Sequence, residues 1–385
     1  MKGRLSAIIV LFLGVTSQDA APPSDWISDN VLFARLEQVF KDSKTPGAVG
    51  AIVRLGEPTR IGAFGVRRAG HDEAMTPADL VHIGSDTKAM TAVLIARLVQ
   101  AKKLRWDSTV AEVLPSMARK LHADFRGVTV RQLMLHRGGL PANPANWFAF
   151  PSKEIHDRRL RIAKAAMSSK PVAQPGEKFI YSNLGIMIAG VMAEAATDAT
   201  WEELMQRELF EPLGMQTASF GIPGTIGKAD QPWGHTERSE GGFTPVQIDN
   251  DPALGPAGTV HLSMADWAKF VAVFLRPQEE PGEEPGEGDP FLTEESMAVL
   301  RGAGAGNDPT PGWGMGWMLV DRPWAGGTAL THTGSNTTWF ANAWVAPEVG
   351  VAFLVAVNAV GSDVPSQADE FIGMCVLAKS DKKGR

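Results

Sequence analysis

The sequence predicts an α+β fold: one antiparallel sheet built from both chain ends, flanked by terminal helices, with an inserted and mostly helical subdomain. Strand-like runs lie in residues 48–67 and 313–358, whereas residues 76–300 alternate helix-like stretches with long loops. Antiparallel strands from the two ends can pair if the chain returns to its starting edge. We therefore expect one domain over residues 22–385, with an α/β subdomain at about 26–75 and 301–380 and a helical subdomain at about 76–300.

The N-terminal elements follow from apolar spacing. Residues 29–41 place apolar side chains on one side, which predicts an amphipathic helix ending before Pro46. Residues 48–55 and 61–67 read as strands, and the intervening Gly56-Glu57-Pro58 indicates a hairpin.

In residues 76–300, the predicted helical subdomain, helices are indicated mainly by capping residues at their N-termini. Thr129 with Gln132, and Thr200 with Glu203, fit capping boxes, in which groups three residues apart cap a helix start. The glycine pair 138–139 is expected to end the first of these helices. Residues 276–289 combine acid, proline and glycine without an apolar anchor, which predicts a solvated surface loop.

After Gly312 the strand pattern returns, in the four runs 313–320, 328–333, 339–346 and 350–358. Residues 367–379 then gather apolar side chains on one face and predict a closing helix. We expect a cleft at the seam between this sheet and the helical block.

Composition excludes several classes of partner and site. The chain has 385 residues, 44% of them hydrophobic, and a net charge of −6, so neither nucleic acid nor an anionic membrane surface is an expected partner. A single cysteine excludes an internal disulfide framework, and the histidines show no metal-ligand spacing, so no metal or other cofactor is expected.

Residues 1–21 read as a cleavable signal peptide. Lys2 and Arg4 precede an apolar run at 5–15, and small residues follow it. The run is shorter than the roughly 20 apolar residues of a permanent membrane anchor. We expect a secreted or periplasmic protein without such an anchor.

Ser85 and Lys88 open the most apolar helix of the chain, because only Thr91 and Arg97 are polar between residues 89 and 99. Such a helix is buried on nearly every side. Residues three apart face the same way, and burial lowers the pKa of a lysine, so Lys88 can act as a base toward a nucleophilic Ser85. The spacing alone is weak, since it recurs at Ser380 and Lys383; a capped core helix is the alternative.

Tyr181 precedes a second apolar helix, in the run Tyr181-Ser182-Asn183, and is the only tyrosine beside 17 phenylalanines and 11 tryptophans. Its hydroxyl is a candidate proton shuttle, although a lone tyrosine can also be a core residue.

The run His332-Thr333-Gly334-Ser335 follows a predicted strand. His332 and Thr333 can donate to a substrate, and Gly334 lets a substrate backbone approach closely. The backbone N–H of Ser335 can pair with that of Ser85 as an oxyanion hole. The similar His136-Arg137-Gly138 is given a structural role, because helix termination explains its glycine.

Taken together, Ser85-Asp86-Thr87-Lys88, Tyr181-Ser182-Asn183 and His332-Thr333-Gly334 resemble the three motifs of the penicillin-recognising serine hydrolases. The resemblance is closest to the group of class C β-lactamases, D-alanyl-D-alanine carboxypeptidases, D-aminopeptidases and family VIII carboxylesterases. It covers roughly residues 30–375 and includes the stretches 132–141, 212–215 and 256–260.

The resemblance implies a β-lactamase/transpeptidase-like fold and a role for each matching residue. Ser85 would be the acylated nucleophile, while Lys88 and Tyr181 would share the general base and acid work. Asn183 would hold the substrate amide carbonyl. The opposite wall, from His332 to Ser335, would bind the substrate, with His332, Thr333 and Gly334 docking its carboxylate.

Two positions depart from this pattern. His332 replaces the lysine of class C β-lactamases and brings a group expected to titrate near neutrality, which favours carboxypeptidase-like or aminopeptidase-like members. Arg137 stands where relatives often carry a small hydroxyl residue, and nothing in the sequence explains it.

The predicted function is an exported serine hydrolase that forms a Ser85 acyl-enzyme on a D-amino-acid peptide, a β-lactam or an ester, most of all of a D,D-peptidase or amidase type. A family VIII-like carboxylesterase is the alternative, and a catalytically idle peptidoglycan-binding relative is a third reading. The chain has no Gly-x-Ser-x-Gly, which argues against an α/β-hydrolase esterase.

Overall fold

A computed structural model of the chain describes residues 28–275, 290–302 and 312–377. The expected signal peptide at 1–21 and the expected loop at 276–289 lie outside these ranges. Among the helices of the described ranges, none is both long and apolar enough to cross a membrane.

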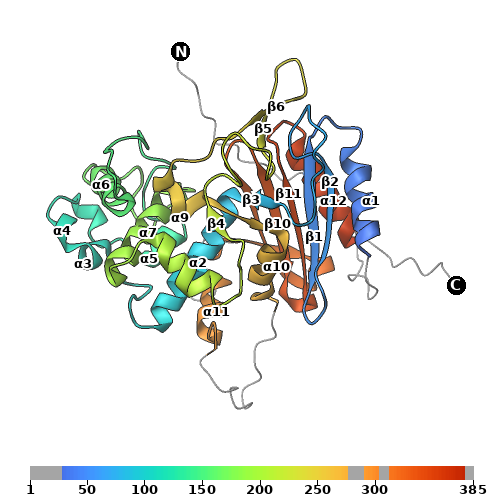
Figure 1. Ribbon diagram of the computed structural model, residues 1–385. Coiled ribbons are helices and arrows are strands. Elements are labelled where there is room, and N and C mark those ends of the chain that lie inside the picture. The colour runs from blue at the N-terminus through green and yellow to red at the C-terminus, as the bar shows by residue number, and fades with distance from the viewer. Residues whose placement is uncertain (1–27, 276–289, 303–311, 378–385) are drawn as a thin grey trace.

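A large antiparallel sheet joins the two ends of the chain, as the sequence predicted (Figure 1). Its strands lie in the order β2 (Arg60–Gly65), β1 (Gly47–Arg54), β11 (Val351–Val357), β10 (Phe340–Ala346), β9 (Gly327–Ser335) and β8 (Met318–Arg322). Ala48 of β1 lies opposite Val357 of β11, so the first and last strands pair at the centre of the sheet. The predicted α+β class is confirmed.

The terminal helices cover one face of this sheet. α1 (Asp29–Phe40) begins at Ser28, whose side chain accepts a hydrogen bond from Val31 N, and lies beside α12 (Val364–Val376). They enclose an apolar cluster with the sheet that includes Leu36, Phe353 and Phe371. α12 begins three residues before the predicted 367.

The other face carries α10 (Met264–Ala272), which packs against β1 and β11, and beyond it the helical part of the molecule. There α2 (Thr87–Gln100) is buried almost throughout, as its apolar sequence predicted. Against α2 pack α7 (Asn183–Thr197), α8 (Trp201–Met205), α9 (Gly255–Gly258) and α11 (Glu294–Leu300), and α5 (Val130–Met134) and α6 (Ile155–Met167) pack on α7.

Shorter elements connect these parts. Two small sheets that the sequence did not indicate contain β3 (Leu80–His82), β7 (Val260–Ser263) and β4 (Ser219–Phe220), and β5 (Gly234–Glu237) with β6 (Phe243–Val246). The remaining helical turns are η1 (Gly84–Asp86), α3 (Val110–Val113), α4 (Pro115–Ala118), η2 (Ala123–Phe125), η3 (Gln206–Phe210), η4 (Pro252–Leu254), η5 (Pro323–Ala325) and η6 (Pro347–Val349).

Two local predictions are corrected by the structure. Both capping boxes form, but α5 ends at Met134 and not at the glycine pair; His136, with φ 59°, leaves the helical region first. The run 313–320 is not one strand, because β8 begins only at Met318. Residues 313–317 instead form a turn whose Gly316 lies so close to α2 that a Cβ there would be 2.6 Å from Ala89 Cα.

Candidate active site

Ser85 and Lys88 meet at the start of α2. Ser85 lies in the turn η1, one helical turn before Lys88, and the Lys88 ammonium donates to Ser85 Oγ at 2.8 Å and to the carbonyl of Ala257 at 2.7 Å. Lys88 is fully buried. The spacing predicted from the sequence therefore becomes a direct contact between the candidate nucleophile and the candidate base.

The charge of Lys88 is set by its surroundings. Burial lowers its pKa from 10.5 to about 7, and the neighbouring Asp86 opposes part of this shift. A substantial share of Lys88 is thus neutral near pH 7 and can accept the Ser85 proton. Asp86 is itself fully buried, which raises the pKa of its carboxyl well above the ordinary value despite the proximity of Lys88.

Tyr181 reaches the same point from the segment before α7. Its hydroxyl makes a side-chain hydrogen bond with Ser85, and Lys88 Nζ lies 4.9 Å from the centre of its ring. Burial raises the pKa of this phenol further above its ordinary value of 10.0. Tyr181 is therefore protonated at neutral pH, which suits a proton donor better than a phenolate base.

The wall opposite α2 is the end of β9. Gly334 approaches η1 so closely that a Cβ would collide with the carbonyl of Ile83 and lie 2.8 Å from Ser85 N. Likewise, a Cβ on Gly84 would collide with Ser335 N. The amide nitrogens of Ser85 and Ser335 thus lie at one tight junction, where the sequence predicted an oxyanion hole. Thr333 stands beside it, half-buried.

His332 differs from its predicted state. The side chain is only 5% exposed, and burial, helped by the positive charge of Lys88, lowers its pKa to about 3. The expectation of a group that titrates near neutrality is wrong, because the sequence could not show how deeply β9 is covered. His332 is a neutral hydrogen-bonding group at pH 7.

Asn183 is the first residue of α7. Its amide Nδ2 donates to Asn143 Oδ1 at 2.9 Å, and its backbone N–H donates to the carbonyl of Ala142. Ser182 before it caps the helix by accepting from Gly185 N. Asn143, which the sequence did not single out, therefore orients the amide expected to hold a substrate carbonyl.

An aromatic wall that the sequence missed surrounds Tyr181. His136 Nδ1 accepts from Ser182 N at 3.1 Å, and its ring centre lies 4.5 Å from that of Tyr181. The ring centre of Trp313 lies 5.3 Å from that of His136 and 5.8 Å from that of His332. The ring centre of Phe179 lies 5.2 Å from that of Trp313. The sequence did not indicate the contact of His136 with Tyr181, because His136-Arg137-Gly138 was explained by helix termination alone. It did not indicate the contacts of Trp313, because Trp313 was assigned to a strand.

Arg137 contacts the loop that precedes Phe179. Its guanidinium donates to the carbonyl of Gly176 at 2.7 Å, so it ties the loop before Phe179 to the end of α5. This contact explains a position that the sequence left open.

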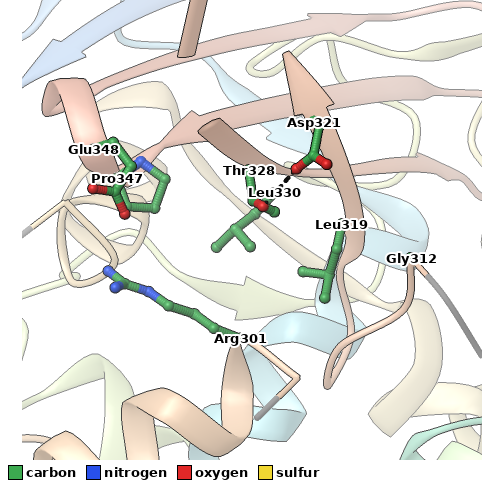
Figure 2. Close-up of a pocket in the computed structure, with 8 residues that line it drawn as sticks. All are labelled: Arg301, Gly312, Leu319, Asp321, Thr328, Leu330, Pro347 and Glu348. Atoms are coloured by element: carbon green, nitrogen blue, oxygen red, sulfur yellow. Dashed lines mark hydrogen bonds between the residues drawn. The ribbon is translucent and has the colours of Figure 1, made fainter. Parts of the chain in front are cut away.

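A separate cavity of about 330 Å³ lies between the end of α11 and the outer strands of the large sheet (Figure 2). Its lining includes Arg301, Asp321 and Glu348, and none of the predicted site residues. Figure 2 shows Thr328 and Asp321 joined by a hydrogen bond, which is 2.7 Å long. In the described ranges, this cavity included, no three His, Cys, Asp or Glu side chains are grouped so that they could hold a metal ion.

Known structures share this fold. The octameric penicillin-binding protein homologue from Pyrococcus abyssi superposes with a TM-score of 0.73 and 23% identity, covering 93% of this chain and 79% of its own. A D-stereospecific amidohydrolase from Streptomyces sp. has a TM-score of 0.68 and 20% identity, covering 92% of this chain and 100% of its own.

Sequence comparisons agree with the structural ones. Penicillin-binding protein 4 of Amycolatopsis lactamdurans is 28% identical over 331 residues, or 84% of each chain. The family described as Beta-lactamase matches residues 33–373, which contain all three motifs. With the fold, the motifs and this match in agreement over most of its length, the protein belongs to the beta-lactamase family of serine hydrolases.

Proposed function

We propose that this protein is an exported hydrolase that forms an acyl-enzyme on Ser85, acting on amide bonds in the manner of a β-lactamase-related D,D-peptidase or amidase. The observation that carries the proposal is the 2.8 Å contact between Lys88 Nζ and Ser85 Oγ, made by a buried lysine whose pKa lies at about 7. A structural lysine that only caps a core helix has no need of this contact.

The residues support a balanced reaction. Neutral Lys88 takes the Ser85 proton as Oγ attacks the substrate carbonyl carbon, and the N–H groups of Ser85 and Ser335 donate to the oxygen that becomes negative. Tyr181 donates its proton to the departing nitrogen and is reprotonated by Lys88. Water then attacks the acyl carbon, gives a proton back to Ser85 through Lys88 and releases the acid.

The choice of an amide draws on the relatives. One is a penicillin-binding protein, another a D-stereospecific amidohydrolase. A third is the unguisins hydrolase ungD' of Aspergillus campestris, which is 26% identical over 211 residues. The match covers 52% of this chain and 39% of the length of that hydrolase. In this proposal Asn183, whose amide donates to Asn143, uses its second N–H to bind the carbonyl of an amide-bearing acyl group.

A carboxylesterase is the second candidate, and the state of His332 favours it. A neutral His332 offers no positive charge to a substrate carboxylate, and the adjoining Trp313 and Phe179 form an apolar wall. This wall suits an uncharged leaving group, such as the alcohol of an ester, better than one that carries a free carboxylate.

The test is covalent labelling of the purified protein by a fluorescent penicillin and by a fluorophosphonate. We expect both probes to label the wild type and Ser85→Ala to remain unlabelled, because the substitution removes the hydroxyl that contacts Lys88. Labelling of Ser85→Ala at the wild-type rate would refute the assignment.

The same preparation separates the two candidates. Nitrocefin, a D-alanyl-D-alanine peptide, a D-amino-acid amide and a short-chain nitrophenyl ester are compared by kcat/KM. Faster turnover of the amide supports the amidase, whereas activity confined to the ester supports the carboxylesterase. Sequencing the N-terminus of protein recovered outside the cytoplasm tests export, with residues 1–21 expected to be missing.

A further inference from the structure

A buried polar chain lies directly behind the junction of Ser85 and Ser335. His82, the last residue of β3, is fully buried, and its Nδ1 accepts a hydrogen bond from Gly84 N at 3.1 Å. Because Nδ1 accepts, a neutral His82 carries its proton on Nε2. That nitrogen lies 3.0 Å from Asp249 Oδ1, in a close contact that is bent from hydrogen-bond geometry.

Asp249 also holds the other side of the junction. Its Oδ1 accepts from Asn336 Nδ2 at 2.9 Å, and Asn336 follows Ser335 directly. Asn336 is buried, and its own oxygen accepts from Thr338 N and Trp339 N, which fixes the loop between β9 and β10. Asp249 Oδ1 thus contacts both His82, which binds the backbone N–H of Gly84 before Ser85, and Asn336, which follows Ser335.

We propose that Asp249 is a positioning residue that keeps the N–H groups of Ser85 and Ser335 in register through His82 and Asn336. The proposal rests on the proposed function, in which these N–H groups stabilise the negative oxygen. Donors in such a site must meet that oxygen at hydrogen-bond distance, so small backbone shifts at Gly84 or Asn336 weaken both at once.

The next residue strengthens the link. Asn250 Nδ2 donates to the carbonyl of Gly258 at 2.8 Å, beside the Ala257 carbonyl that accepts from Lys88. The segment therefore contacts β3 just before η1, the β9–β10 loop, and the carbonyl next to the one that accepts from Lys88. Asp251, two residues from Asp249, instead pairs with Arg158 of α6 and caps η4, so it provides a control within the same segment.

The experiment compares three variants. Asp249→Ala removes the shared acceptor, whereas Asp249→Asn keeps an oxygen that can accept from both His82 and Asn336. Asp251→Ala removes a carboxylate of the same loop that does not reach the junction. Acylation by the nitrophenyl ester is followed in single turnovers, with the melting temperature recorded for each variant.

We expect Asp249→Ala to lower the acylation rate about 10- to 100-fold, less than the 100- to 1,000-fold loss for removing one oxyanion donor, with little change in KM. Asp249→Asn should restore most of the rate, and Asp251→Ala should react like the wild type. Affinity for a boronic acid, whose oxygen occupies the oxyanion position, should fall in parallel with the rate.

Amide hydrogen exchange in the free protein separates this proposal from the proposed function. Peptides containing residues 83–86 and 335–339 should exchange faster in Asp249→Ala than in Asp251→Ala, even if no substrate is ever turned over. Unchanged exchange, or an Asp249→Ala rate within twofold of the wild type, would overturn the positioning role. Equal losses in Asp249→Ala and Asp251→Ala would also overturn it, because they indicate general destabilisation.

Discussion

Lys88 combines two demands that usually conflict. It is fully buried, which favours the neutral amine, yet it donates to both Ser85 Oγ and the Ala257 carbonyl, which suits the ammonium. Burial outweighs the opposing charge of Asp86 and lowers the pKa to about 7, within the range where a general base works best.

This balance predicts a pH profile for acylation. As pH rises through about 7, Lys88 loses its proton and kcat/KM should rise to a plateau, since only the neutral amine can accept the Ser85 proton. His332, with its pKa near 3, should add no further limb between pH 5 and 8. Stopped-flow acylation from pH 5 to 9 measures this.

The control is His332→Gln, in which the midpoint should stay near that of the wild type. A rate that is flat across pH 7, or that falls as pH rises, would contradict Lys88 as the base. If the wild-type rate falls at high pH and this fall disappears in His332→Gln, the result would support the titrating His332 that the sequence predicted.

At the scale of elements, the helices around α2 are joined by a buried ionic cluster. Arg159 of α6 is fully buried and contacts Glu194 of α7 at 2.8 Å and Glu202 of α8 at 2.9 Å. Glu194 also accepts from Trp201 N at 3.0 Å and pairs with His156. The cluster fixes α6 and α8 against α7, whose first residue is Asn183, the proposed substrate-binding amide.

Removing one charge from this cluster should be costly. Glu194→Gln leaves Arg159 buried with only Glu202 as its acidic partner, so we expect a loss of about 3 kcal/mol in the free energy of unfolding, the lower end for a broken buried pair. Urea titration measures it. Asp157→Asn on the same helix breaks an exposed pair with Arg161 and should change stability little. Equal stability of wild type and Glu194→Gln would show that the cluster contributes nothing.

At the scale of the molecule, His235 ties three distant parts together. It lies on β5, its Nδ1 is 2.6 Å from the carbonyl of Asn358 beyond β11, and its Nε2 accepts from Ala69 N beyond β2. A second proton would disrupt the contact with Ala69. Burial lowers the pKa of His235 to about 4.

This contact predicts a dependence of stability on pH. Between pH 6.5 and about 4 the unfolded chain binds a proton at His235 that the folded protein does not. Stability is therefore fully present above 6.5 and falls with decreasing pH, by about 1.4 kcal/mol per unit for such a group. Unfolding of His235→Asn, which keeps a donor toward Asn358, should show a shallower slope over this window. Identical slopes in variant and wild type would refute the argument.

Much of the molecule was predictable because it is governed by local rules. Strand runs at both ends, the amphipathic terminal helices and the apolar α2 follow from side-chain periodicity, and the position of those runs predicted a sheet built from both ends. The contact of Ser85 with Lys88 follows from the three-residue spacing at a helix start. These features depend on neighbours in sequence.

The sequence by itself thus determined the class of fold and the spacing that brings Ser85 and Lys88, the proposed nucleophile and base, into contact. Only the tertiary structure decided that His332 is neutral, that the ring of Trp313 packs beside it, and that Asp249 joins His82 to Asn336. The physical reason is that a pKa depends on every group that displaces water around a side chain. Likewise, a hydrogen bond between distant segments depends on how whole elements pack, and neither quantity is written in the spacing of residues along the chain.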